Sequence, residues 1–392
     1  MRFLRSVENQ TLLALGLAVL TGLYWPAFAL KIGLVGDVFL RLLKMIIAPL
    51  ILASVYTSVS GLGSIARVKN LGVKTLIYYL ATTSLAVIAG LILVNLIRPG
   101  AKAVFLREAP SLKTFTLSDL VLSLIPQNPV KSVAEGEVLP IIFFALAFGL
   151  ATLSLPKGRQ RLLFDFFEAL NDALIVLIRW IIYLTPAGVF AIVAKLVAEK
   201  GLSPLLELSS YVLTVVLGLF LHAAGTLALL LFLFAREKPW RFFLKVREAL
   251  LVAFSTASSA ATLPISLEVA EEKAGIPKKV AGFVLPLGAT VNMDGTALYE
   301  AVAAMFIANV CGVELSLGQQ ILIFLTATLA SIGAAGIPSA GLVTMTMVLQ
   351  TVGLPLEGIG LILAVDRFLD MLRTSVNVWG DLIGARIIAR YT

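Results

Sequence analysis

The chain has 392 residues, of which 59% are hydrophobic and only 14% are charged, and its mean hydropathy is +0.99. Soluble domains are about 45–50% apolar and about 25% charged, so this composition excludes a soluble enzyme and indicates a polytopic membrane protein. The net charge of +8 is no sign of nucleic-acid binding, because the basic residues lie in short loops between apolar runs. A single cysteine and a single histidine exclude an internal disulfide and a Cys/His metal cluster.

Six apolar segments of at least span length precede the most basic loop of the chain. The first has no small-residue cleavage motif and is therefore predicted to be a span, not a removed signal peptide. The fourth is too long for one straight helix and is interrupted by prolines, so several helical pieces are expected there. In chain order the six segments cover residues 11–30, 35–62, 75–97, 120–155, 164–197 and 205–234.

The distribution of Lys and Arg predicts two re-entrant hairpins. Basic loops mark the cytoplasmic side, which places the loops at 67–74, 157–161 and 236–247 and both termini on that side. The apolar segment between Arg247 and Glu268 is followed by further basic residues, so it begins and ends inside. By the same logic, the segment between Glu314 and Glu357 begins and ends outside. We therefore expect eight transmembrane helices and two re-entrant hairpins, at about 240–273 and 316–353.

The two hairpins and the spans that follow them form an internal repeat. Ala260–Pro264 and Ala334–Pro338 share one pattern 74 positions apart, and Val291–Gly295 is echoed by Val376–Gly380. Two copies that enter the membrane from opposite sides are inverted repeats, which are typical of secondary transporters whose site lies between broken helices. Irregular backbone at membrane depth is allowed only where protein or a cavity surrounds it.

The last apolar segment carries a stripe of polar side chains. At about 100° per residue, the stripe covers an arc of roughly 80° on a helix. One Asp or Arg at the centre of a membrane helix costs about 2.5–3.5 kcal/mol, so such a stripe indicates a functional site facing protein or water. The stripe consists of Asp366, Asp370, Arg373, Asn377 and Asp381.

A second polar motif lies in the seventh span. Asn292 and Asp294 are two positions apart, so a regular helix would not present both on one face, and we expect an unwound turn there. Asp294 and the three Asp of the stripe oppose only Arg367 and Arg373, which leaves about two negative charges at low dielectric. Mobile cations or protons must compensate them, so cation coupling is predicted.

These motifs resemble the glutamate transporter family, the dicarboxylate/amino acid:cation symporters, and in particular a prokaryotic member. The resemblance lies in Asn292–Thr296, in the Ser-rich tip of the first hairpin, in the Gly/Pro tip of the second, and in the Asp-x3-Asp-x2-Arg-Thr-x2-Asn-x3-Asp pattern that starts at Asp366. It covers essentially the whole chain. It implies Na⁺-coupled symport of aspartate or glutamate and no enzymatic activity.

The resemblance also implies roles for individual residues. Arg373 would bind the side-chain carboxylate of the substrate, and Asp370 would hold its amino group. The remaining substrate contacts would come from Asn377, Thr296, Thr374, Ser259 and the backbone at Ala257, Ile337 and Gly341. A first Na⁺ would bind Asp381 with carbonyls of Gly288, Asn292 and Asn377; a second would bind carbonyls of Thr290, Ser331, Ile332 and Ala334; a third would bind Tyr79, Thr82, Thr83, Asn292 and Asp294.

The resemblance divides the chain into two functional parts. Residues 1–71 and 99–204 would form a scaffold, and residues 72–98 and 205–392 would form a transport domain that moves like an elevator. The protein would be a homotrimer in the inner (plasma) membrane, in contact with lipid, with both termini cytoplasmic. The chain departs from the family at the first tip, where Ala257 replaces an Arg that some members have. Arg367 is our candidate for supplying that charge.

Other functions are weighed against this one. A proton-coupled carrier of the same substrates is the nearest alternative. Na⁺ is favoured by the retention of Asp294, Asp381, Thr82 and Thr83. A C4-dicarboxylate lacks the ammonium group that Asp370 would hold. An intramembrane serine hydrolase needs a general base near its nucleophile, and the single His222 lies in another segment. A dedicated ion channel would not need an Arg/Asp site for an amino acid.

Overall fold

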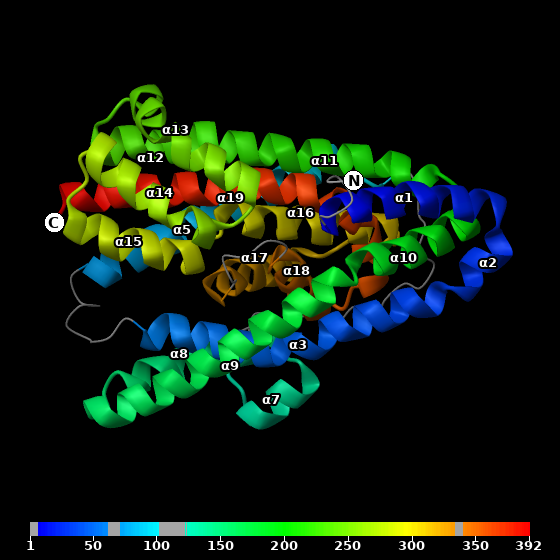
Figure 1. Cartoon of the computed structure of the whole chain (residues 1–392), viewed down its shortest axis with the longest axis horizontal. Coiled ribbons are helices and arrows are strands. Elements are labelled where there is room, and N and C mark those ends of the chain that lie inside the picture. The colour runs from blue at the N-terminus through cyan, green and yellow to red at the C-terminus, as the bar shows by residue number, and fades with distance from the viewer. Residues whose placement is uncertain (1–6, 62–70, 102–121, 123, 334–339) are drawn as a thin grey trace.

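The computed structural model describes residues 7–61, 71–101, 122, 124–333 and 340–392, and every regular element in those ranges is helical (Figure 1). The all-α class is therefore confirmed. Three of the described helical stretches are individually long and apolar enough to cross a membrane, and they cover Pro26–Ser60, Val73–Ile97 and Glu207–Ala235. A fourth crossing is possible if the bent pair Lys157–Tyr183 and Thr185–Glu199 is counted as one span.

One group of helices lies along the lower and right-hand edges of Figure 1. α3 packs against α8, α9 and α10, and α10 also packs against α1 and α2. The group consists of α1 (Val7–Tyr24), α2 (Pro26–Lys31), α3 (Gly33–Ser60), α7 (Pro129–Glu135), α8 (Val138–Thr152), α9 (Lys157–Tyr183) and α10 (Thr185–Lys200).

Two span boundaries in this group differ from the sequence prediction. The expected first span over 11–30 breaks at Trp25, because Pro26 begins a new helix that continues toward α3. The expected fifth span over 164–197 is two helices bent by 49° next to Leu184, with Pro186 in the first turn of α10. Proline is well tolerated in the first turn of a helix, so both breaks coincide with new helix starts. The predicted interruption of the fourth segment is confirmed by the separate α7 and α8.

The second group surrounds the last helix, α19 (Ile359–Arg390), which crosses the upper half of Figure 1. α19 packs against the sixth segment, the first hairpin and both pieces of the seventh segment. The members that precede the hairpins are α5 (Val73–Ile97), α11 (Ser203–Leu221), η3 (His222–Leu227), α12 (Ala228–Leu230) and η4 (Leu231–Ala235). η3 and η4 are π-helical, so the sixth segment is a helical rod with two irregular stretches.

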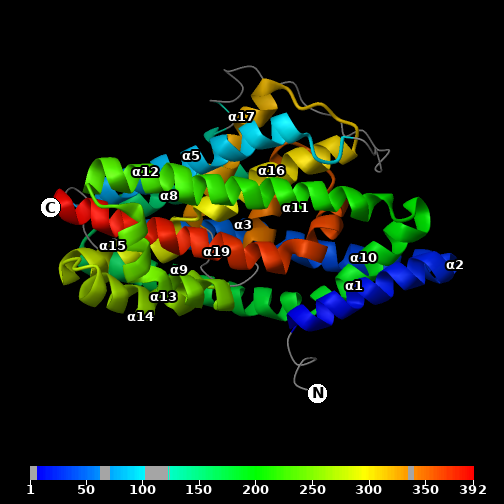
Figure 2. The ribbon, with the colours of Figure 1, turned by 90° about the horizontal axis from the view of Figure 1, so that it is seen from above.

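The first hairpin consists of α13 (Pro239–Thr256), α14 (Ser259–Glu268) and the π-helical η5 (Val269–Lys273). It turns at Ala257, whose φ of 49° is left-handed, and the Ser258 hydroxyl then accepts from the backbone of Ala261 as the N-cap of α14. An ion pair of 2.6 Å between Lys273 and Glu248 joins its two arms. These bounds agree with the prediction of about 240–273, and Figure 2 shows α13 and α14 side by side.

The second hairpin consists of α17 (Leu317–Ala330), η6 (Ser331–Gly333) and α18 (Ala340–Thr351), and a short η7 (Leu356–Gly358) leads into α19. α17 packs against α18, as the prediction of a hairpin over about 316–353 requires. η6 and α18 also contact α3, so this hairpin joins the two groups of helices.

The seventh segment is broken, as predicted. α15 (Lys278–Val291) ends before Asn292, which is extended at φ −95° and ψ 99°, and α16 begins at Asp294. The break at Asn292 and Met293 leaves backbone groups outside any helical ladder in the centre of the second group. α19, by contrast, continues without interruption past this level.

Candidate substrate and cation site

The polar stripe of α19 is buried in the protein interior, as the sequence predicts. The exposed fractions of its five side chains lie between 0% and 5%. Arg373 is the centre of the stripe: its Nη2 lies 2.8 Å from Oδ1 of Asp370 and 3.0 Å from Oδ1 of Asp366. Tyr299 of α16 donates its hydroxyl to Asp366 at 2.7 Å, and its ring lies 3.8 Å from the guanidinium carbon of Arg373.

Arg373 keeps two donors for a further partner. Its Nε and Nη1 are buried and have no hydrogen-bond partner among the described residues. Gly341, at the start of the second arm of hairpin 2, lies directly over this side of Arg373. A Cβ at Gly341 would be 3.3 Å from Nη1 of Arg373 and 3.2 Å from Cγ2 of Thr296. The geometry therefore combines unpaired guanidinium donors with a neighbouring carboxylate at Asp370, which suits a ligand that has both an acidic and an amino group.

Asn377 connects the stripe to the broken helix. Its Oδ1 accepts from the backbone N–H of Gly295 at 2.7 Å, and its Nδ2 lies 3.4 Å from the Thr296 hydroxyl. Gly295 has no side chain where the backbone of Arg373 approaches, since a Cβ there would be 2.7 Å from the Arg373 carbonyl oxygen. α19 and the start of α16 are thereby in near backbone contact beside Arg373.

The first predicted cation site is assembled around Asp381. Asn292 donates its Nδ2 to Oδ1 of Asp381 at 2.9 Å, and a Cβ at Gly288 would lie 2.2 Å from the same oxygen and 2.4 Å from the Tyr79 hydroxyl. Only glycine at 288 therefore allows Asp381 to approach α15. The carbonyls of Gly288, Asn292 and Asn377 lie on the segments that surround this carboxylate.

The third predicted site is assembled around Asp294, which is completely buried. The hydroxyls of Thr82 and Thr83 on α5 lie 3.2 and 2.7 Å from its Oδ1. On the other side, Nε2 of His222 lies 3.1 Å from Oδ2. Tyr79 is one turn from Thr83 on α5 and donates its hydroxyl to the carbonyl of Val284 at 2.8 Å.

The second predicted cation site and part of the substrate set are described incompletely. α15, which carries Thr290, contacts η6, which carries Ser331 and Ile332, so these predicted ligands belong to neighbouring elements. Ala334 and Ile337 lie outside the described residues. At the first hairpin tip, Ala257 and Ser259 are buried, as is Thr374 on α19.

The chain matches the profile of the family described as "Sodium:dicarboxylate symporter family" over residues 8–391. It belongs to that family. Among its relatives, excitatory amino acid transporter 2 of Homo sapiens is 39% identical over 434 residues, which cover 95% of this chain and 75% of the relative. Excitatory amino acid transporter 3 of Mus musculus is 39% identical and excitatory amino acid transporter 1 of Ambystoma tigrinum is 38% identical; these matches cover 91% and 90% of this chain and 78% and 76% of the relatives. The resemblance inferred from the motifs is confirmed.

The symporter site also contains residues that sequence reasoning missed. Glu300 of α16 is 1% exposed and accepts a hydrogen bond from Thr344 of hairpin 2. The charge count based on sequence left Glu300 out, so the core holds five carboxylates against two guanidiniums. The signal was available, because Glu300 is the one acidic residue in α16 besides Asp294. Tyr299 was also missed, since nothing in an apolar stretch marks an aromatic ring as an arginine partner.

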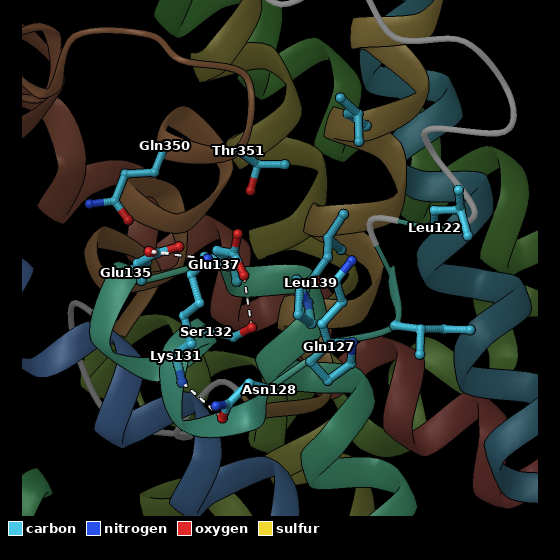
Figure 3. A pocket seen from close by; sticks show the side chains of 16 residues that line it. Leu122, Gln127, Asn128, Lys131, Ser132, Glu135, Glu137, Leu139, Gln350 and Thr351 are labelled. Atoms are coloured by element: carbon cyan, nitrogen blue, oxygen red, sulfur yellow. Dashed lines mark hydrogen bonds and ion pairs between the residues drawn. The ribbon is translucent and has the colours of Figure 1, made fainter.

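A separate cavity of about 650 Å³ lies outside this symporter site (Figure 3). It is lined by α7 and α8, including Lys131, Glu135 and Glu137, and by Gln350 and Thr351 at the end of α18. None of the predicted site residues lines it. Arg373, by contrast, is fully buried.

Proposed function

We propose that this protein is a sodium-coupled symporter of acidic amino acids, with aspartate or glutamate as substrate. The observation that carries the proposal is the buried Arg373, whose Nε and Nη1 have no partner among the described residues while Asp370 lies beside it. A guanidinium binds a carboxylate through parallel N–H donors, so these atoms suit the side chain of an acidic amino acid. The family of the chain and its relatives, the excitatory amino acid transporters, support the same function.

The amino group of the substrate would bind Asp370, and the substrate would be enclosed by both hairpin tips. Thr296, Thr374, Asn377 and Ser259 would supply hydrogen bonds, together with backbone at Ala257, Ile337 and Gly341. The close approach of Gly341 to Arg373 supports this enclosure, because it brings hairpin 2 over the guanidinium. A neutral amino acid would leave the Arg373 donors unpaired in a buried site, which costs affinity.

Sodium would neutralise the excess of buried carboxylates. Asp381 and Asp294 are the two ligands with a formal charge, and each is held by polar groups from other helices. Oxygen ligands of this type are expected for hard cations, and the broken helix between α15 and α16 adds backbone carbonyls. The positive charge of a bound cation would favour binding of the negatively charged substrate. The bound substrate would favour the cation in turn.

Transport would proceed by movement of one group of helices against the other. Residues 72–98 and 205–392 would form the moving transport domain, and residues 1–71 and 99–204 the scaffold. Most of the helix packing lies within these two groups, with links between them at α10–α19 and at hairpin 2 and α3, which supports this division. We further propose a homotrimer in the inner membrane, in contact with lipid, with cytoplasmic termini.

Calorimetry on the purified protein tests the function. Aspartate and glutamate are titrated in Na⁺, and then in K⁺ or choline at matched ionic strength. Binding in Na⁺ alone is the expected result. Equal affinity in all three salts, with a dependence on pH, would instead assign the protein as a proton-coupled carrier. Uptake into proteoliposomes without cleavage of the substrate separates the transporter from a hydrolase.

A further inference from the structure

The sixth segment is irregular at the level of the cation site. After the regular α11, residues His222–Leu227 are π-helical, and this stretch contacts α5 and α19. A π-helical turn interrupts the normal ladder of backbone hydrogen bonds and costs stability, so it is found frequently at functional sites. None of the residues in this stretch is among the predicted substrate or cation ligands.

The first residue of the stretch reaches the Asp294 carboxylate. His222 is 0% exposed, and its Nε2 lies 3.1 Å from Oδ2 of Asp294. Because an ionised carboxylate only accepts hydrogen bonds, Nε2 is the donor. Nδ1 is buried without a partner among the described residues, which fits a ring with its single proton on Nε2. The two oxygens of Asp294 are therefore held by different helices, Oδ1 by α5 and Oδ2 by the π-helical stretch.

The second residue of the stretch is held by the last helix. The indole N–H of Trp379 donates to the carbonyl of Ala223 at 3.1 Å. Trp379 is itself wedged against Phe242 of hairpin 1, with ring centroids 5.6 Å apart. Its neighbour Gly380 lets α19 approach the broken helix, since a Cβ there would lie 2.9 Å from Nδ2 of Asn292 and 3.2 Å from Oδ2 of Asp294. The π-helical stretch thus accepts a hydrogen bond from α19 at the Ala223 carbonyl and donates one to Asp294 through the His222 side chain.

We propose that the π-helical stretch His222–Leu227, anchored by Trp379, orients the Asp294 carboxylate for sodium, with His222 as the positioning residue. The inference rests on the proposed function, because it assigns a support to one of its cation sites. A carboxylate whose oxygens are both fixed in advance needs no reorganisation when the cation arrives. Hydrogen-bond partners of a ligand typically change cation affinity by about 10–100-fold when they are removed.

The test compares four variants by aspartate calorimetry at a series of Na⁺ concentrations. His222→Leu removes the donor, His222→Gln keeps an N–H donor near the position of Nε2, and Trp379→Phe removes the indole N–H. Thr214→Val is the matched control: Thr214 lies on α11, is 0% exposed, and its hydroxyl bonds only within its own helix, to the Ser210 carbonyl at 2.7 Å. The readout is the Na⁺ concentration for half-maximal aspartate binding, alongside the Tm measured without Na⁺.

His222→Leu is expected to raise the half-maximal Na⁺ concentration by at least about tenfold, and His222→Gln by less than about threefold. Trp379→Phe is expected to raise it by about threefold, and Thr214→Val to leave it unchanged. A wild-type Na⁺ requirement in His222→Leu would overturn the inference, as would equal shifts in His222→Leu and Thr214→Val. If His222→Leu does not fold, Trp379→Phe decides. A higher half-maximal Na⁺ concentration in Trp379→Phe supports the proposed positioning of Asp294, and an unchanged concentration overturns it.

The proposed function and the proposed role of His222 are contradicted by different results. If wild-type protein binds no acidic amino acid in Na⁺, the proposed function is wrong. If wild-type protein shows Na⁺-dependent binding and His222→Leu shows the same dependence, the function stands and only the role of His222 is lost. A purely structural role of His222 would lower the Tm and leave the Na⁺ requirement unchanged.

Discussion

α19 and the α15–α16 pair lie side by side at the site but contribute to it differently. α19 is one continuous helix of 32 residues, so most of its backbone groups are used in its own ladder and it contributes mainly side chains. The pair is broken at Asn292 and Met293, so it also offers backbone carbonyls and N–H groups. Arg373 and Asp370 of α19 belong to the proposed substrate position, whereas Asn292 and Asp294 of the break belong to the proposed cation positions.

This difference suggests a division of tasks. An intact helix presents charges at fixed spacing, which suits recognition of a substrate with two charged ends. A broken helix presents carbonyl oxygens in several directions, which suits a cation that must exchange its hydration shell. Substitutions at Arg373 and Asp370 of α19 should therefore change substrate choice more than Na⁺ requirement, and substitutions around the break and at Asp381 should do the reverse.

Replacing the arginine of α19 gives the largest expected effect. Arg373→Ala removes the donors that would bind the substrate carboxylate, and truncating one partner of a buried, hydrogen-bonded charge pair costs about 2–5 kcal/mol of binding free energy. Aspartate affinity should fall on the order of a thousandfold, as measured by calorimetry in Na⁺. Arg179→Ala, at an exposed position on α9, serves as the control. Near-normal aspartate affinity in Arg373→Ala would end the division of tasks proposed for α19.

Adding a methyl group at Gly288, on α15 before the break, should change the Na⁺ requirement. Gly288→Ala would place its Cβ 2.2 Å from Oδ1 of Asp381, so the carboxylate must move away from α15. We expect the Na⁺ concentration for half-maximal aspartate binding to rise by about a hundredfold, the upper range for a disturbed ligand shell. Gly282→Ala is a matched control, because nothing lies within 4 Å of a Cβ at that position of the same helix. Equal behaviour of the two variants would contradict the prediction.

Loss of one hydroxyl near Asp294 should be milder. Thr83→Val deletes the 2.7 Å hydrogen bond to Oδ1 of Asp294, and a hydrogen bond to a charged group contributes about 1.5–3 kcal/mol. Because Thr82 also reaches this oxygen, the Na⁺ requirement should rise by only about tenfold. Thr75→Val, also fully buried on α5 and bonded only to the Leu71 carbonyl, should leave it unchanged. Calorimetry over a Na⁺ series distinguishes the two.

The smallest effect is expected at Arg367. The Ser375 hydroxyl of α19 bonds the carbonyl of Leu250 on hairpin 1. Arg367 lies two turns before Ser375, and the hairpin tip lies two turns after Leu250, so both are near the same level. If it supplies the charge that Ala257 lacks, Arg367→Ala should change the aspartate uptake rate in proteoliposomes by about fivefold, the equivalent of about 1 kcal/mol. Arg367→Lys should retain most of the wild-type rate. Unchanged uptake in Arg367→Ala removes this residue from the transport mechanism.

Periodicity and charge were sufficient to predict much of the fold and the buried polar stripe of α19. The arc from Asp366 to Asp381 followed from helical spacing, and the break at Asn292 followed from two polar residues that one helix face could not hold. The hairpins followed from the positions of Lys and Arg. Each of these patterns is local in sequence, and local patterns are what periodicity records.

The remaining features depend on contacts between distant segments. His222 and Asp294 are 72 positions apart, and Trp379 and Ala223 are 156 apart. No spacing rule connects such pairs, so neither His222 nor Trp379 was identified from the sequence as part of the site. The breaks at Trp25 and Leu184 were missed because proline in an apolar run is compatible with either a kink or a new helix start.

The five buried carboxylates and two guanidiniums have a consequence for energetics across the bilayer. With every carboxylate ionised, this cluster has a formal charge of −3, counting Asp294, Glu300, Asp366, Asp370 and Asp381 against Arg367 and Arg373. Moving one elementary charge through the membrane potential involves about 2.3 kcal/mol per 100 mV. Any step that carries the cluster across the membrane is therefore sensitive to voltage, and the number of cations bound sets the sign of the current.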